Sequence, residues 1–164
     1  MITPATLANA KAFLCWEVFD NLGIQLVPLR PAVAYYHPPQ NNRHGIVLCY
    51  NPGAQDLSEA LFLLFHEAGH ARQWTQLQAA GRGDYFAAMR DSDRGDEKTQ
   101  FEQKAWECGR ELLERFADRE HLAASVLAQY DLYGRACLLS YRDSAHSGER
   151  PYAATTNSHS GHET

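Results

Sequence analysis

Two histidines and a glutamate lie within five consecutive residues near the middle of the chain, in the segment His66-Glu67-Ala68-Gly69-His70. If this segment is helical, the four-residue spacing stacks His66 and His70 on one face, so both imidazoles can reach one metal ion. Glu67 then lies beside the two ligands, where it can take the proton of a metal-activated water, as the general base of a zinc hydrolase does. The segment therefore predicts a zinc site with a base next to it.

The surrounding residues favour a buried helix that carries this segment. Asp56 followed by Glu59 is typical of an N-cap with a capping box, and the run from Ala60 to Phe65 is apolar. Polar side chains on a buried helix need partners, which a metal ion would supply; a purely structural pair of histidines is the alternative. Gly69 costs about 1 kcal/mol in a helix, which indicates close approach by a neighbouring backbone.

A third ligand is expected, because catalytic zinc sites use three protein ligands and keep a fourth position for water. Periodicity predicts a helix from about residue 99 to 117, with Glu102 on the same face as Trp106 and Leu113. A carboxylate on that face is costly unless it is paired or metal-bound, which favours Glu102 as the ligand. Glu107, on the polar face, is the alternative, and a favourable charge in the first helical turns would explain Glu102 without a metal.

Length and composition fit a single globular domain. The chain has 164 residues, 45% of them apolar, and a net charge of −5, which predicts no direct nucleic-acid binding. Its four cysteines are widely spaced and are expected to be buried small side chains. Because no apolar run approaches about 18 residues and the first 20 residues lack a signal-peptide pattern, we expect a soluble, cytoplasmic protein with no membrane contact.

The remaining elements follow from apolar periodicity and turn residues. Thr3 and Pro4 predict the start of a first helix, which is expected to end at Gly23. Three short strands are then expected at residues 24–29, 32–36 and 46–50. The last of these strands directly precedes the central helix, and we expect its edge to accept an extended substrate.

The second half of the chain is predicted to be mostly helical. Residues 79–98 are rich in glycine and charge, which indicates a mobile loop with one helical turn, a candidate lid. Asp118 is expected to cap a last helix that ends near Tyr141. Polar, small residues follow, so the prediction is one domain at 1–142 and a polar C-terminal tail at 143–164.

The order of these features resembles a known arrangement. A strand, an Asn-containing turn, the helix with His66 and His70, and a later Glu102-Gln103-Lys104-Ala105 segment resemble the gluzincin zinc metallopeptidases. The short single-domain form is most similar to the ImmA/IrrE family, over about residues 45–113. Trp106 departs from the Asn or Asp that this family usually has there.

The resemblance implies an α+β, zincin-like (minigluzincin) domain with a small N-terminal sheet and an active-site helix packed in a helical bundle. It implies that His66, His70 and Glu102 bind Zn²⁺ and that Glu67 is the catalytic base. The function expected is hydrolysis of a peptide bond in a specific protein partner, commonly in phage-like or mobile elements. The alternatives are a catalytically weak, zinc-containing regulatory or binding module and, third, hydrolysis of a non-peptide amide.

An intact Glu67 favours catalysis, because a purely structural zinc site needs no base and usually closes with four protein ligands. A side chain that stabilises the oxyanion is also expected. The candidates are Tyr85, Tyr130, Tyr133, His37 and His121.

Overall fold

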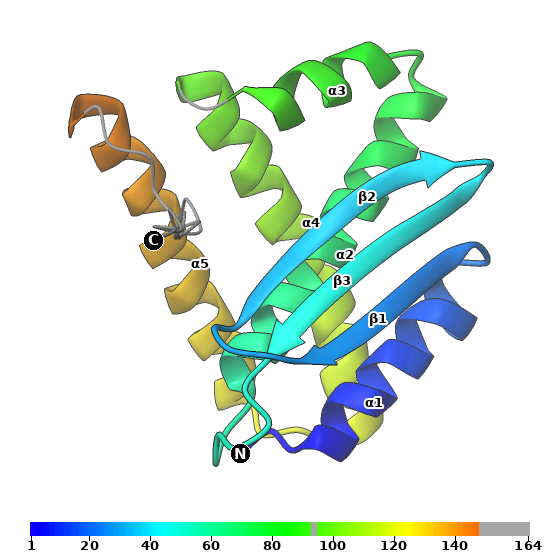
Figure 1. Cartoon of the computed structure of the whole chain (residues 1–164), viewed down its shortest axis with the longest axis vertical. Helices are drawn as coiled ribbons and strands as arrows, with labels where there is room; N and C mark the ends of the chain where they lie inside the picture. Colours follow the sequence, from blue (N-terminus) through cyan, green and yellow to red (C-terminus); the bar gives the residue numbers. More distant parts are fainter. Residues whose placement is uncertain (93–94, 148–164) are drawn as a thin grey trace, which may run out of the picture.

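The computed structural model describes residues 1–92 and 95–147, with side chains to residue 139. Within these ranges the chain forms five α-helices, one π-helical turn and a three-stranded sheet (Figure 1). The α+β class expected from the sequence is confirmed. No helix in the described ranges is long and apolar enough to cross a membrane.

The sheet consists of β1 (Leu22–Pro28), β2 (Val33–Gln40) and β3 (Arg43–Tyr50), in the order β1-β3-β2. β1 runs parallel to β3, and β2 runs antiparallel to it. Because β3 is paired on both sides, it has no free edge, and the prediction that strand 46–50 accepts an extended substrate is wrong. The strand order depends on long-range pairing, and it leaves β1 and β2 as the edge strands within the described part of the chain.

The N-terminal helix α1 (Pro4–Phe13) begins as predicted, since the Thr3 side chain accepts a hydrogen bond from the backbone of Thr6. α1 continues into the π-helical turn η1 (Leu14–Val18). The predicted helix end at Gly23 is wrong. Phe19 is already extended, with φ −129° and ψ 121°, and Gly23 lies within β1.

The central helix α2 (Ser58–Ala79) confirms the helix expected around the two histidines. Its predicted capping box does not form. Leu57 occupies the N-cap position without a side-chain hydrogen bond, while the Asp56 carboxylate accepts from the backbone nitrogen of Ile2 at 2.6 Å. Asp56 thus ties the N-terminus of the chain to the start of α2.

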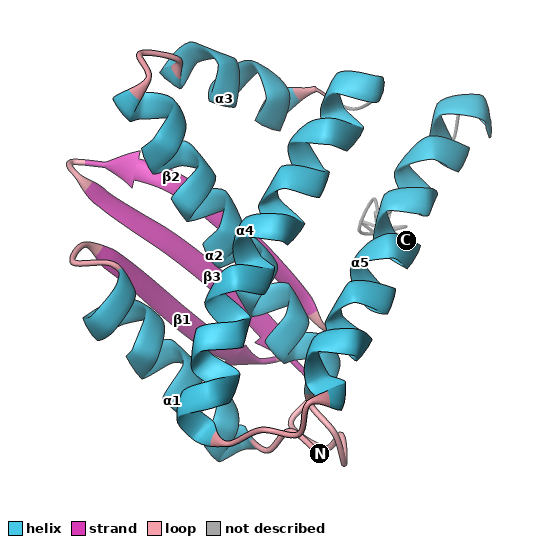
Figure 2. Ribbon diagram, turned by 180° about the vertical axis from the view of Figure 1, so that it is seen from behind, coloured by secondary structure: helices cyan, strands magenta, loops and turns pink. Residues whose placement is uncertain are grey.

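The helix α4 (Asp96–Glu120) crosses α2 at close range, on the side away from the sheet (Figure 2). A Cβ on Gly69 would collide with the carbonyl oxygen of Ala105 and lie 2.8 Å from the nitrogen of Gly109. A Cβ on Gly109 would collide with the carbonyl oxygen of Phe65. The close backbone approach predicted for Gly69 is therefore confirmed, and it brings the facing side chains of the two helices together.

The segment predicted as a mobile loop contains the nine-residue helix α3 (Gly83–Asp91) rather than a single turn. Phe86 accounts for this ordering, because it is only 2% exposed and packs against the rings of Tyr36 and Phe101. Residues 93–94 of that segment lie outside the described residues.

The last helix, α5 (Ser125–Ser147), begins later than predicted. Asp118 does not cap it, because α4 continues to Glu120 and ends at His121, which adopts the left-handed conformation. Of the predicted tail, residues 143–147 continue α5, and residues 148–164 lie outside the described residues.

Candidate metal centre

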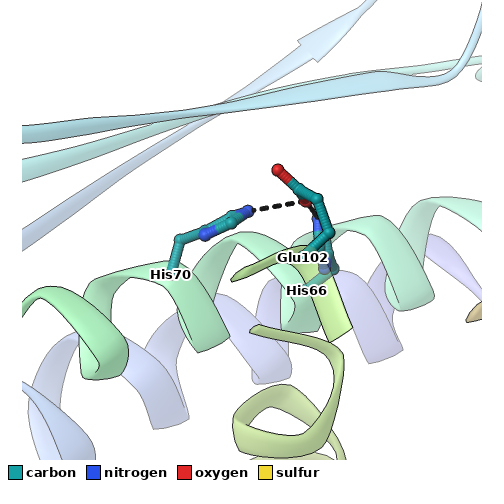
Figure 3. Close-up of side chains that lie close together, drawn as sticks. All are labelled: His66, His70 and Glu102. Atoms are coloured by element: carbon teal, nitrogen blue, oxygen red, sulfur yellow. Dashed lines mark hydrogen bonds and ion pairs between the residues drawn. The ribbon is translucent and has the colours of Figure 1, made fainter. Parts of the chain in front are cut away.

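Three buried side chains from two helices converge beneath the sheet (Figure 3). His66 and His70 lie one turn apart on α2, and Glu102 reaches them from α4. Oε2 of Glu102 lies 3.2 Å from Nε2 of His66 and 3.2 Å from Nε2 of His70. The structure thus brings together the three residues expected as ligands, and this group could hold a metal ion.

The separations between the ligand atoms suit a shared ion. In a tetrahedral zinc site with ligands about 2.0–2.1 Å from the metal, two ligand atoms lie about 3.3 Å apart. The two nitrogen–oxygen distances of 3.2 Å are close to this value. Two imidazoles and one carboxylate form a donor set that catalytic zinc sites use, with a fourth position open.

Gln73 determines which nitrogen of His70 carries a hydrogen. The amide nitrogen of Gln73 donates to the carbonyl oxygen of Phe101 at 3.0 Å, so its amide oxygen faces Nδ1 of His70 at 3.1 Å. Because an amide oxygen only accepts, Nδ1 of His70 must donate. In the neutral ring, Nε2 then presents a lone pair to a carboxylate oxygen of Glu102. These two acceptors require a cation between them, either a proton or a metal ion.

Glu102 is ionised despite its burial. Burial acts to raise its pKa, but the charge of His70 and hydrogen bonds from both histidines outweigh it and hold the pKa of Glu102 below its usual range. Its second oxygen, Oε1, lies 3.0 Å from Nζ of Lys98. The two carboxylate oxygens therefore face different partners.

Aromatic rings fix the orientation of both imidazoles. His66 stacks on Trp106 with ring centroids 4.1 Å apart, and its Nδ1 has no hydrogen-bond partner among the described residues. Trp106 thus holds His66 by stacking, at the position where the resembled family has a polar residue. His70 lies between Phe101, at 5.3 Å, and Tyr36, at 6.4 Å.

A cavity of about 530 Å³ opens beside this group. Glu67 lines it together with His66, His70 and Glu102, and its side chain is largely buried. β2 and α3 form the other walls, with Tyr36, His37, Phe86 and Arg90 among the lining residues. The candidate base and the three candidate ligands therefore face one space large enough for a substrate.

The structure does not bring Glu107, the alternative third ligand, to the histidines. Its carboxylate accepts from Gln103 and Lys104 on the surface of α4. Of the five candidates for stabilising an oxyanion, His37 lines the cavity. Tyr130 and Tyr133 make other contacts, to the carbonyl oxygen of Trp106 and to Glu59, respectively. Neither Tyr85 nor His121 lines the cavity.

Sequence reasoning did not single out Gln73, Lys98 or Tyr36, which all lie around the site. Helical spacing could have identified Gln73 and Lys98 as neighbours of the candidate ligands. Gln73 follows His70 by three positions and Lys98 precedes Glu102 by four, so each is one turn from a candidate ligand. Tyr36 reaches the site through the pairing of β2 with β3 and has no comparable local signal.

No family model, curated protein or solved structure matches this chain. The resemblance to zincins therefore has no support from a relative. What the protein does is inferred from the geometry of the site and the cavity beside it.

Proposed function

We propose that the protein is a zinc-dependent metallopeptidase with a zincin-like site of the gluzincin type. His66, His70 and Glu102 would bind Zn²⁺, and Glu67 would be the general base. One observation carries this proposal: Oε2 of Glu102 lies 3.2 Å from Nε2 of both His66 and His70, close to the separation of two ligand atoms in a tetrahedral zinc site.

A zinc ion bound there would polarise a substrate carbonyl and lower the pKa of water. Glu67 follows His66 in the sequence, lines the same cavity and is not one of the three converging side chains. Its carboxylate would take a proton from the attacking water and pass it to the leaving amine. This step requires Glu67 to be unprotonated when the substrate binds.

A peptide is the proposed substrate because the cavity adjoins a free sheet edge. Residues 34–38 of β2 line the cavity, and among the described residues β2 pairs with a strand, β3, on one side only. The unpaired backbone groups on its other side can bind an extended chain. A folded protein partner would supply such a chain from an exposed segment.

The catalytically weak regulatory module is the second candidate. A structural zinc site usually has four protein ligands. In the part of the chain that the structure describes, three His, Cys, Asp or Glu side chains come together around the site. A set of three ligands within the described residues is the number that catalytic zinc sites use, which supports catalysis over a structural site.

Metal analysis and a base substitution test the proposal together. Wild type should contain one zinc per chain, and His66→Ala and Glu102→Ala should lose it. Glu67→Gln should keep zinc and fold but lose about 10² to 10⁴ in turnover of a peptide library or partner protein. Glu114→Gln, on the exposed face of α4, is the matched control and should retain wild-type activity.

Two results would contradict the proposal. Cleavage by Glu67→Gln at the wild-type rate would exclude Glu67 as the base. If zinc-loaded wild type cleaved nothing while its zinc depended on His66 and Glu102, the regulatory module would be the better account.

A further inference from the structure

Lys98 connects the candidate ligand Glu102 to α3, the helix that walls the cavity. Its side chain is 12% exposed, and its Nζ lies 3.0 Å from Oε1 of Glu102. The same ammonium donates to the carbonyl oxygen of Met89 at 2.9 Å and lies 3.5 Å from that of Arg90. Both carbonyls belong to the last turn of α3, where carbonyl groups lack partners within the helix and a cation is favourable.

This contact separates the roles of the two oxygens of Glu102. Oε1 faces Lys98, whereas Oε2 faces the imidazoles of His66 and His70. An ammonium held at Oε1 therefore turns Oε2 toward the position that a shared ion would occupy. Oε1 is thus occupied by Lys98, and Oε2 is the oxygen that would face an ion.

α3 packs against the core through Phe86 and, less deeply, through Tyr85 and Met89. Phe86 is its buried residue, packed against the rings of Phe101 and His70. Gly81 and Gly95, which flank the helix, have φ values of 68° and 109°, and a Cβ on either would meet no atom within 4 Å. A side chain at either glycine would have open space, so the position of α3 depends on its own side-chain contacts and on Lys98.

We propose that Lys98 is a positioning residue that couples occupancy of the metal site to the docking of α3. The inference rests on the proposed zinc site. An ion at Oε2 would fix the Glu102 carboxylate and thereby hold the ammonium against Met89. A docked α3 would in turn keep the ammonium where it orients Glu102. Because such coupling is reciprocal, each event stabilises the other.

Hydrogen exchange of the α3 amides, with and without Zn²⁺, tests this coupling. In wild type, Zn²⁺ should slow exchange across α3 about fivefold or more, the lower end of typical coupling. Lys98→Met keeps the apolar stem and should abolish the zinc effect. Lys98→Arg should restore it in part, because a guanidinium can also bridge a carboxylate and a carbonyl. Lys104→Met, an exposed lysine on the same helix, is the matched control.

Cobalt(II) in place of zinc gives a second readout. Lys98→Met frees Oε1 of Glu102, so the carboxylate can bind through both oxygens and the visible absorption of Co²⁺ should change with coordination number. Lys104→Met should leave the spectrum as in wild type. Lys98→Gln keeps the site polar and replaces Lys98→Met if that variant does not fold, with the same losses expected.

The outcomes separate this inference from the proposed function. If wild type binds zinc but the Lys98 variants keep both the wild-type cobalt spectrum and zinc-dependent protection of α3, Lys98 has no coupling role. If wild type binds no zinc, the proposed function is overturned. The coupling is then overturned too, because it requires zinc at the site. Loss of zinc-dependent protection together with a changed cobalt spectrum in Lys98→Met or Lys98→Gln, with Lys104→Met unchanged, supports the coupling.

Discussion

Gln73 holds His70 from within the same helix, with its amide oxygen 3.1 Å from Nδ1 of the imidazole. Gln73 is itself held by the carbonyl oxygen of Phe101, so it bridges α2 and α4 at the metal centre. Acceptors of this kind fix the tautomer and orientation of a ligand histidine and usually contribute 10- to 100-fold, roughly, to metal affinity.

We therefore predict that Gln73→Leu weakens zinc binding by about 10- to 100-fold, measured by competition with a chelator. Gln76→Leu, at an exposed position one turn away, is the control and should bind zinc as wild type does. Unchanged affinity in Gln73→Leu would show that His70 needs no partner at Nδ1.

A second prediction concerns the pH dependence of the metal-free protein. Burial acts to lower the pKa of His70, but the Glu102 carboxylate outweighs it and raises that pKa above 6.5. The resulting stabilisation is complete below about pH 6.5 and is lost as the pH rises through the raised value. Glu102, with its pKa held below 4.5, stabilises the fold above about pH 4.5 and loses this effect at lower pH. The metal-free protein should be most stable between these limits.

Above about pH 6.5, where the metal-free protein loses stability, the zinc-loaded protein should instead gain stability. Binding needs Nε2 of His70 without a proton, so zinc affinity rises with pH over the range in which the metal-free protein loses stability. Melting temperatures in EDTA and in zinc should therefore diverge as the pH rises above about 6.5. Identical pH profiles under the two conditions would argue against a metal site at His70.

The crossing of α2 and α4 gives a third prediction. An alanine normally stabilises a helix relative to glycine by about 1 kcal/mol. At Gly69 the added methyl would collide with the backbone of Ala105, so Gly69→Ala should instead lower the free energy of unfolding by about 1–3 kcal/mol. Gly53→Ala, where a Cβ meets nothing closer than 3.5 Å, is the control. Denaturant unfolding measures both, and equal stability of the two variants would refute a tight crossing.

Tyr36 and His44 give a fourth prediction, about the sheet. The hydroxyl of Tyr36 and Nδ1 of His44 lie 2.7 Å apart and are buried, and burial lowers the pKa of His44. Tyr36→Phe leaves that nitrogen without a partner and should destabilise the fold by about 1–3 kcal/mol. Tyr35→Phe, at an exposed neighbour on the same strand, should have little effect in the same thermal denaturation assay. Similar losses in both variants would show that the buried hydrogen bond is not the cause.

Sequence patterns predicted the features of this fold that depend on residues close together in the chain. Thr3 and Pro4 started the first helix where expected, and the apolar face of α4 identified Glu102, which the structure places beside both histidines. Helical spacing alone puts His66 and His70 on one face. These features need only neighbours one or two turns away.

Features that depend on distant residues were missed. Asp56 has the sequence context of a cap, but its carboxylate binds the backbone of Ile2, 54 positions away. α3 is ordered by Phe86 through rings from β2 and α4. The central place of β3 follows from its pairing with both other strands, which no short stretch of sequence encodes.

His70 and Glu102 are 32 positions apart, and α3 lies between them. An ion shared by the two side chains would close this stretch into a loop, as a disulfide would. Closing a loop of that length lowers the conformational entropy of the unfolded chain, which stabilises the folded state by up to about 4 kcal/mol. Removing the ion would release this constraint on the unfolded chain, so the whole domain should unfold at a lower denaturant concentration with a chelator than with zinc.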